Sequence, residues 1–246
     1  MKLEDYLKEI ETFIKDYLDK TKMSGYILGV SGGIDSALVA MLAHRAVKDK
    51  LYCLVLPCDS NSNDEKDAVE LLEKYHIAYS TINLTDTYVK MVKDMEKAYG
   101  HELTPLARNN VKVRLRMVTL YAIGQTRNSL VLGTDNWDES YTGYFTKYGD
   151  GGVDLLPIIH LTKGEVFAAS KLLGVTETIL KRKPSAGLFI DQTDEGELGV
   201  TYKEIDDYLL GHEVSESAKE RIEHLHKVSA LSLIHISEPT RRRGIS

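Results

Sequence analysis

The stretch that decides the fold runs Tyr26-Ile-Leu-Gly-Val30 and continues directly as Ser31-Gly-Gly-Ile-Asp-Ser36. The first five residues are typical of a buried strand, and Ile34–Val47 has the composition of a long helix. A strand that ends in two glycines before a helix predicts a phosphate-binding loop, because glycine lets backbone N–H groups approach an anion closely. The hydroxyls of Ser31 and Ser36 add further donors. An ordinary serine–glycine turn is the alternative, but the flanking strand and helix favour phosphate binding.

Asp35 needs a separate explanation, because a carboxylate repels a bound phosphate unless a cation lies between them. Mg²⁺ is a hard ion that takes carboxylate and phosphate oxygens together, so we predict a magnesium site at Asp35. The loop has no lysine after its second glycine and is therefore not a Walker motif, and it does not match G-x-G-x-x-G either.

Outward from this loop, strands and helices alternate along the chain. Further strands are predicted at Leu51–Leu56, Ala78–Ile82 and Ser129–Leu132. The predicted helices cover residues 3–20, 34–47, 64–75, 85–98, 105–127, 162–173, 202–210 and 215–228. This alternation predicts an α/β fold with a Rossmann-like, doubly wound, mostly parallel sheet and helices on both faces. In such sheets the site lies beyond the carboxyl ends of the strands. We expect residues 141–154 to form a substrate loop and residues 183–199 a mobile lid.

Composition limits the class of protein and its partners. The 246 residues suit one domain, and the net charge of −6 argues against a nucleic-acid partner held by bulk electrostatics. No run approaches ~20 apolar residues, so we expect no membrane span. The first segment, Met1–Lys20, has no apolar signal core. Cys53 and Cys58 are too few for a disulfide framework, which favours reduced thiols and a cytoplasmic location.

The last residues differ in character from the rest of the chain. Leu231–Arg241, LSLIHISEPTR, matches the translation of a common transposon-type sequencing adaptor. We therefore predict a single domain over residues 1–230 and a non-native read-through tail over residues 231–246. A natural basic tail, made by Arg241–Arg243, is the alternative.

The loop Ser31–Ser36 resembles that of the PP-loop, or N-type ATP pyrophosphatase, superfamily, whose members adenylate a substrate oxygen and release pyrophosphate. GMP synthetase, asparagine and argininosuccinate synthetases and tRNA-modifying ligases share this loop. A second block, Gly133–Ser140 (GTDNWDES) followed by Tyr141–Ile158, resembles the NAD synthetase family more specifically. The resemblance extends over residues 3–230 and implies an adenine nucleotide alpha hydrolase-like fold.

Several polar residues around this block have the chemistry that such a site needs. Glu139 follows a strand end and can supply a second carboxylate to a metal held by Asp35. Lys147 and Lys163 can neutralise charge on a departing pyrophosphate. Asp150 lies in a glycine-rich turn, where a carboxylate can approach a substrate closely. For each residue alone a solvated surface charge is the alternative, whereas the whole spaced set favours catalysis.

The resemblance implies four groups of site residues. The catalytic group is Asp35, Glu139, Asp150 and Lys163. The ATP-binding group is Gly29, Ser31, Gly32, Gly33, Asp35, Ser36, Thr134, Lys163 and Ser185. The deamido-NAD-binding group is Arg114, Lys147, Asp154 and Glu197, and the metal ligands for Mg²⁺ are Asp35 and Glu139. The segment Leu54–Asn61 departs from the family, because relatives often place a basic residue and a glutamine near ATP there.

The resemblance also implies a reaction. ATP, as co-substrate, adenylates the pyridine carboxylate of deamido-NAD, and ammonia displaces AMP to give NAD and pyrophosphate. Glutamine-using relatives carry a large additional amidase domain, for which this chain has no room, so free ammonia is the expected nitrogen source. The family is homodimeric. The alternatives are another PP-loop ligase, such as a tRNA-modifying enzyme, and a non-catalytic nucleotide-binding protein.

Overall fold

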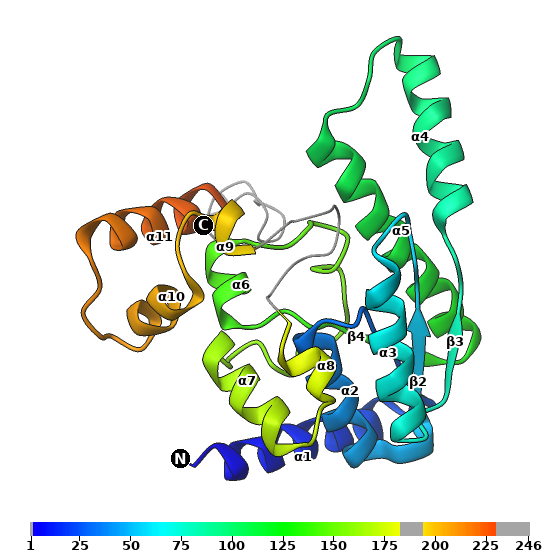
Figure 1. The fold of residues 1–246 in the computed structure, drawn as a ribbon. Helices are drawn as coiled ribbons and strands as arrows, with labels where there is room; N and C mark the ends of the chain where they lie inside the picture. The colour runs from blue at the N-terminus through cyan, green and yellow to red at the C-terminus, as the bar shows by residue number, and fades with distance from the viewer. Residues whose placement is uncertain (1, 183–193, 230–246) are drawn as a thin grey trace, which may run out of the picture.

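A parallel four-stranded sheet lies at the centre of the computed structural model, which describes residues 2–182 and 194–229 (Figure 1). The strands are β1 (Gly25–Gly29), β2 (Leu51–Val55), β3 (Tyr79–Thr81) and β4 (Ser129–Leu132). Their order across the sheet is β3-β2-β1-β4, and every pairing is parallel. Leu28 of β1 therefore lies opposite Cys53 of β2 and Leu132 of β4. The predicted parallel α/β sheet is confirmed.

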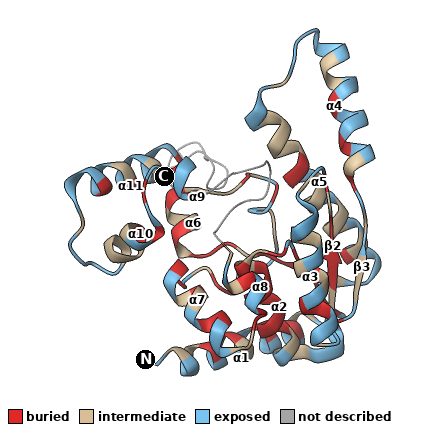
Figure 2. Ribbon diagram, in the orientation of Figure 1, coloured by how far each residue is buried: buried red, intermediate tan, exposed pale blue. Residues whose placement is uncertain are grey.

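Helices cover both faces of this sheet, because alternate residues of each strand point to opposite sides. On one face, Tyr26 and Leu28 pack with apolar residues of α1 (Leu3–Thr21), α2 (Ile34–Val47) and α7 (Lys163–Leu172). On the other face, Ile27 and Val131 pack with α4 (Thr85–Tyr99) and α5 (Pro105–Thr126). Figure 2 shows the buried residues concentrated in the sheet and in the helix surfaces that face it, with α2 almost wholly buried.

All eight predicted helices are present, with ends that differ by at most two residues. The remaining elements are the 3₁₀ turn η1 (Lys48–Lys50) and the helices α3 (Ser62–Lys74), α6 (Trp137–Thr142), α8 (Glu177–Leu180), α9 (Asp194–Leu198), α10 (Tyr202–Leu209) and α11 (Glu216–Ser229). Helices α10 and α11 pack with α6 and α7 beside the sheet (Figure 1).

Two short helices overlap segments for which we expected loops: α6 extends into the first two residues of the expected substrate loop, and α9 lies within the expected lid. Helix α6 begins at a capping box, in which the Asn136 side chain accepts from Glu139 N and the Glu139 side chain accepts from Asn136 N. Helix α9 contains residues from the end of the expected lid, and the rest of that segment, residues 183–193, lies outside the described part. The predicted tail at residues 231–246 lies outside it as well.

The start of α2 is the element end that matters most for the site. Gly33 occupies its N-cap position, and no side chain there satisfies the first backbone N–H groups. By contrast, α5 is capped by Thr104 and α7 by Thr162. An uncapped helix N-terminus leaves N–H donors and the positive end of the helix dipole available to an anion. Among the described helices, none is long and apolar enough to cross a membrane.

Candidate active site

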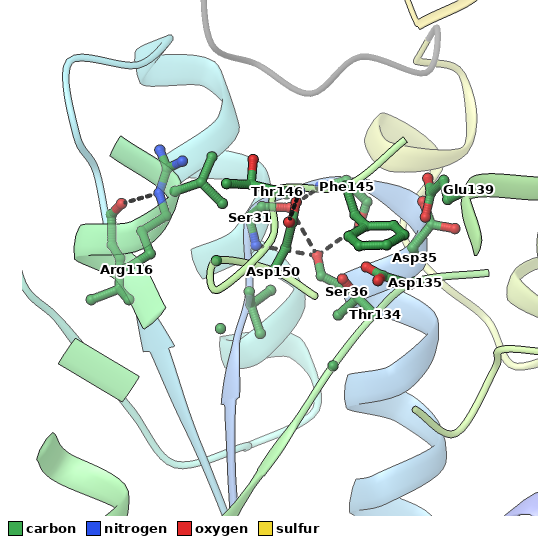
Figure 3. Close-up of a pocket in the computed structure, with 18 of the residues that line it drawn as sticks. Ser31, Asp35, Ser36, Arg116, Thr134, Asp135, Glu139, Phe145, Thr146 and Asp150 are labelled. Atoms are coloured by element: carbon green, nitrogen blue, oxygen red, sulfur yellow. Dashed lines mark hydrogen bonds between the residues drawn. The ribbon is translucent and has the colours of Figure 1, made fainter. Parts of the chain in front are cut away.

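The carboxyl ends of β1, β2 and β4 open into a cavity of about 750 Å³. Its lining includes the loop after β1, the segment after β2, the segment Leu132–Asp135 after β4, and parts of α5, α6 and α7. Figure 3 shows the polar side chains of these segments converging on one space. The site therefore lies at the edge of the sheet that the alternation of strands and helices predicted.

The loop after β1 is held in shape by its own hydroxyl groups. Ser31 N donates to Ser36 Oγ at 3.1 Å, and Ser36 Oγ donates to Gly33 O at 3.0 Å. Gly33 N donates to Ser31 Oγ at 3.2 Å. Gly32 has a φ of +83°, and a Cβ atom there would overlap the backbone oxygen of Asp64 on α3. Only glycine fits this position without strain, as expected for a loop shaped around an anion.

A lysine joins two carboxylates at one end of the cavity. Lys163 Nζ lies 2.7 Å from Asp35 Oδ2 and 3.3 Å from Glu139 Oε1, although these residues are far apart in the sequence. The Asn136 side-chain amide donates to the other oxygen of Asp35 at 2.8 Å. The side chain of Lys163 is only 3% exposed. Three of the four predicted catalytic residues thus form one hydrogen-bonded cluster.

Burial changes the acid–base properties of this cluster. Burial alone would lower the pKa of the Lys163 ammonium, but the charges of Asp35 and Glu139 raise it above its ordinary value. Burial raises the pKa of Glu139 to about 8, although the neighbouring Lys163 acts in the opposite direction. The pKa of Asp135, a buried neighbour in the same lining, is also raised by burial and then by the charge of Asp150. Lys163 is therefore protonated and positively charged at neutral pH.

The two carboxylates have the chemistry of a magnesium site but not of a metal site made by protein alone. The described residues contain no group of three or more histidine, cysteine or acidic side chains arranged to hold a metal. Mg²⁺ is usually held by one or two carboxylates together with substrate phosphates, so Asp35 and Glu139 beside a phosphate loop fit that ion. In the structure the positive charge between them is the Lys163 ammonium.

The fourth predicted catalytic residue, Asp150, lies in the cavity lining away from this cluster. Its carboxylate accepts from Thr146 N at 2.6 Å and from Gly151 N at 3.1 Å, so its orientation is fixed by backbone donors. Gly29, at the end of β1, and Thr134, after β4, also line the cavity.

The predicted deamido-NAD-binding residues are divided by the structure. Glu197 lines the cavity and accepts from the Tyr144 hydroxyl at 2.6 Å. Arg114, Lys147 and Asp154 are not among the described residues that line it. Arg114 Nε donates to Lys147 O at 3.2 Å, which joins two of them outside the cavity.

Asp154 has a clear structural partner instead. It accepts from Val131 N at 2.7 Å and from the Tyr121 hydroxyl at 3.1 Å, and so joins β4 to α5. The predicted ATP contact Ser185 lies outside the described residues.

The structure adds site residues for which the sequence gave little signal. Tyr144 and Tyr202 donate to opposite oxygens of buried Asp194, at 3.1 and 2.9 Å. Lys163 Nζ lies 4.8 Å from the centre of the Tyr202 ring. Asn136 was recognisable in principle, because an asparagine three residues before a glutamate is a helix-start pattern. The tyrosines could not be assigned, since the contacts of Tyr144 with Asp194 and of Tyr202 with Lys163 join residues 50 and 39 positions apart.

A parallel sheet with a phosphate loop after its central strand, and with an Asp–Lys–Glu cluster at one end of that loop, defines a nucleotide-binding enzyme of the PP-loop class. Comparison with known proteins gives the family. The model of the NAD synthase family matches residues 6–241, and the chain belongs to that family. An NH₃-dependent NAD⁺ synthetase from Mesoplasma florum is 46% identical over 232 residues, which are 93% of each chain. The corresponding protein from Carboxydothermus hydrogenoformans is 42% identical over 226 residues.

Solved structures of two relatives show the same fold. An NMN synthetase from Francisella tularensis superposes with a TM-score of 0.92 at 39% identity, over 98% of this chain and 99% of the relative. An NH₃-dependent NAD synthetase from Campylobacter jejuni, in complex with nitrate, superposes with a TM-score of 0.79 at 29% identity. It covers 97% of this chain and 100% of its own.

Proposed function

We propose that this protein is an ammonia-dependent NAD synthetase, a ligase that forms a C–N bond by amidating deamido-NAD at the expense of ATP. The observation that carries the proposal is the Asp35–Lys163–Glu139 cluster beside the Ser31–Ser36 loop, in a chain of the NAD synthase family. Both parts of the site can stabilise the negative charge of bound phosphates. The loop supplies fixed N–H and hydroxyl donors, and the cluster supplies a buried cation and two carboxylates that suit a metal.

The pyridine carboxylate of deamido-NAD does not react with ammonia directly, because an oxide is a poor leaving group. Attack of a carboxylate oxygen on the α-phosphorus of ATP forms an acyl-adenylate and releases pyrophosphate. Ammonia then adds to the acyl carbon, and AMP leaves with its oxygen while a proton passes to a base. Lys163 stabilises the negative charge that develops on the phosphates, and the N–H groups at the start of α2 bind the released pyrophosphate.

We propose Asp35 and Glu139 as the residues that hold Mg²⁺ when ATP is bound. A magnesium ion there would offset phosphate charge during adenylation. Asp150, which faces the same cavity and is fixed by Thr146 and Gly151, is proposed to orient the substrate or ammonia. Gly29, Thr134 and Ser185 remain proposed ATP contacts, and Arg114, Lys147, Asp154 and Glu197 remain proposed deamido-NAD contacts. Arg114, Lys147 and Asp154 are not in the described lining, so deamido-NAD would have to extend beyond the cavity to reach them.

The deciding experiment incubates the protein with ATP, Mg²⁺, an ammonium salt and deamido-NAD, and measures NAD and AMP. We expect both products in equal amounts, and none when ATP or ammonium is omitted. Production of AMP without NAD would contradict the proposal. Asp35→Asn and Glu139→Gln should each abolish turnover while the thermal unfolding of the free protein remains cooperative.

A mononucleotide acceptor is the second candidate, and one observation favours it: the NMN synthetase superposes more closely than the Campylobacter NAD synthetase, with TM-scores of 0.92 and 0.79. The corresponding substrate, nicotinic acid mononucleotide, carries the same pyridine carboxylate and lacks the adenylate half of deamido-NAD. Measuring kcat/KM for both acceptors with one enzyme preparation separates the candidates. A higher value for the mononucleotide would reassign the substrate and leave the chemistry unchanged.

We further propose a homodimer, a cytoplasmic location and a single domain over residues 1–230. The dimer is supported by exposed apolar side chains on α4 and α5, including Val89, Tyr99 and Val118. Light scattering on the purified protein tests it.

The location is supported by two buried thiols, Cys53 and Cys58, and by the use of ATP. Resequencing of the gene across its 3′ end tests whether residues 231–246 are a read-through tail.

A further inference from the structure

The charged side chains of the cavity are unequally distributed. Among the described residues, eight carboxylates and three cations line it. The cations are Arg116, Lys163 and Arg182. Both proposed nucleotide substrates carry several phosphate charges, so such an acidic cavity needs every available cation to bind them. A cation that has no carboxylate partner is the best suited of the three to bind a substrate phosphate.

Two of these cations already have carboxylate partners. Lys163 bonds Asp35 and Glu139. Arg182, at the end of α8, pairs with Asp64 and, at 2.8 Å, with Asp67, both on α3. A substrate phosphate that approached either cation would have to compete with those carboxylates.

Arg116 is different. Its Nε donates to Leu56 O at 3.0 Å, just beyond the end of β2, which anchors the side chain. Within residues 2–182 and 194–229, its two terminal nitrogens have no hydrogen-bond or ion-pair partner. Asp64 and Asp150 are near enough to act on it electrostatically, but Asp64 is bonded to Arg182 and Asp150 to backbone N–H groups. Burial lowers the pKa of the Arg116 guanidinium, and the charges of its neighbours oppose that change.

The position of Arg116 relative to the phosphate loop completes the argument. In Figure 3, Arg116 lies to one side of Ser31, and Asp35 and Glu139 lie to the other. A guanidinium fixed through Nε keeps two parallel N–H donors, which match two oxygens of one phosphate group. We propose that Arg116 binds a substrate phosphate at the β2 end of the cavity, opposite the Lys163 end. This proposal rests on the proposed function and deepens it. The segment Leu54–Asn61 contains no basic residue, and Arg116, bonded to Leu56 of that segment, supplies one from α5.

The test compares Arg116→Gln, Arg116→Lys and a control, Arg108→Gln. Arg108 lies two turns earlier on α5, outside the described lining, and bonds Glu96. We expect Arg116→Gln to raise the KM for one substrate about tenfold or more, because hydrogen bonds to charged groups are among the stronger ones. An effect on the KM for ATP assigns the phosphate to ATP, and an effect on the KM for deamido-NAD assigns it to the dinucleotide. Arg116→Lys should recover part of the loss, since lysine keeps the charge but not the fork.

Binding without turnover keeps this test separate from the test of the function. The chain has a single tryptophan, Trp137 on α6 next to the site, so its fluorescence can report ATP and deamido-NAD binding directly. If the wild-type protein forms no NAD, the proposed function fails, and the binding titrations still test Arg116. Unchanged affinity for both substrates in Arg116→Gln, or in Arg116→Lys if the glutamine variant does not fold, would overturn the proposal. An equal loss of affinity for adenosine, which has no phosphate, would overturn it as well.

Discussion

At the scale of single residues, the proposed catalytic cluster joins one buried cation to two carboxylates. Asp35 and Glu139 lie at one end of the cavity, and Lys163 lies between them in an almost fully buried position. Removing one member of a buried ionic group leaves the others without compensation, which is more harmful than never having built the group. Besides its proposed role in the chemistry, Lys163 therefore keeps the two carboxylates together before any substrate binds.

We expect Lys163→Met to lower kcat at least about a hundredfold, because a preorganised cation that faces developing phosphate charge is worth that much or more. The same change should lower the free energy of unfolding, since Asp35 and Glu139 lose their shared partner. Initial rates of NAD formation and thermal unfolding measure the two effects. Lys171→Met, an exposed change in the last turn of the same helix, is the control and should alter neither much.

Behind Lys163 lies a second acidic contact, between Asp138 and Asp206. The backbone N–H of Lys163 donates to both carboxyl groups, at 3.3 and 3.2 Å, and Asp138 Oδ2 is buried without a hydrogen-bond partner among the described residues. Burial, followed by the neighbouring Asp206, raises the pKa of Asp138 to about 9. A proton on Asp138 lets it donate to Asp206, which removes the repulsion between the two.

The free energy of unfolding depends on pH because Asp138 has different pKa values in the folded and unfolded states. Asp138 ionises near pH 4 in the unfolded chain and near pH 9 in the folded one, so the folded state binds an extra proton in between. The contribution of Asp138 to the free energy of unfolding should therefore fall by about 1 kcal/mol per pH unit from pH 7 towards 9, and Glu139, whose pKa is raised to about 8, adds to the same slope. Urea titrations of the metal-free protein measure this slope. Asp138→Asn, whose amide can donate to Asp206, should make it shallower, whereas the half-buried neighbouring change Asp207→Asn should not. Equal slopes in all three proteins would contradict the assignment.

At the scale of elements, the junction of β1 with α2 carries the proposed phosphate-binding groups. The strand supplies a rigid base, two glycines supply the bend, and the uncapped N-terminus of α2 supplies donors. Asp64 of α3 lies against the same bend, since its backbone oxygen approaches Gly32. The loop is therefore held by β1, by the start of α2 and by α3, and needs little rearrangement to receive a phosphate.

We expect Gly32→Ala to weaken ATP binding by at least tenfold and to destabilise the fold by roughly 1–3 kcal/mol, because a positive φ and a backbone overlap coincide there. Gly100→Ala is a matched control: its φ of +81° is nearly the same, but no atom lies within 4 Å of the added Cβ. That change should cost about 1 kcal/mol and leave ATP binding unaltered. Fluorescence titration and thermal unfolding give both quantities. Equal effects of the two changes would show that loop strain alone, rather than the contact with Asp64, explains the result.

The elements also show how far the sequence could be interpreted. The strands were predictable because Tyr26–Val30 and Leu51–Leu56 are short apolar runs bounded by turn residues. Helix α6 was missed because its six residues are too few to show a helical period, and its stability comes from a capping box and from α10 and α11.

Arg114 and Arg116 are two residues apart on α5, so their side chains leave the helix in directions about 200° apart. The sequence could not show which of them faces the cavity.

At the scale of the whole molecule, the site depends on complete folding. The segments that supply Asp35, Asn136, Glu139 and Lys163 are joined only through the sheet and the helices that cover it. The family pattern could identify Asp35, Glu139 and Lys163 by position, but it did not identify Asn136. The hydrogen bonds to Asn136 and Asp206, and the contact of Lys163 with the Tyr202 ring, could not be predicted, because they depend on how α6, α7 and α10 pack.

The two thiols offer a measurement of global unfolding. Cys53 and Cys58 are fully buried, and burial raises the pKa of both thiols, so neither is present as a reactive thiolate at neutral pH. We expect a thiol-specific reagent to modify both only as fast as the molecule opens, and saturating ATP with Mg²⁺ to slow modification in proportion to ligand binding. Single changes Cys53→Ser and Cys58→Ser identify which thiol reacts. Rapid modification of Cys58 alone would show that the segment after β2 opens independently.

The pairing of Lys163 with Asp35 joins positions 128 residues apart. During synthesis, the phosphate loop emerges from the ribosome long before the lysine that completes the cluster. A nascent or prematurely ended chain that lacks α7 therefore holds Asp35 without its cation and cannot present a competent nucleotide site. Cells that make this protein should contain no partly active fragments that sequester ATP, and nucleotide affinity should appear in one step once the segment beyond β4 has joined the sheet.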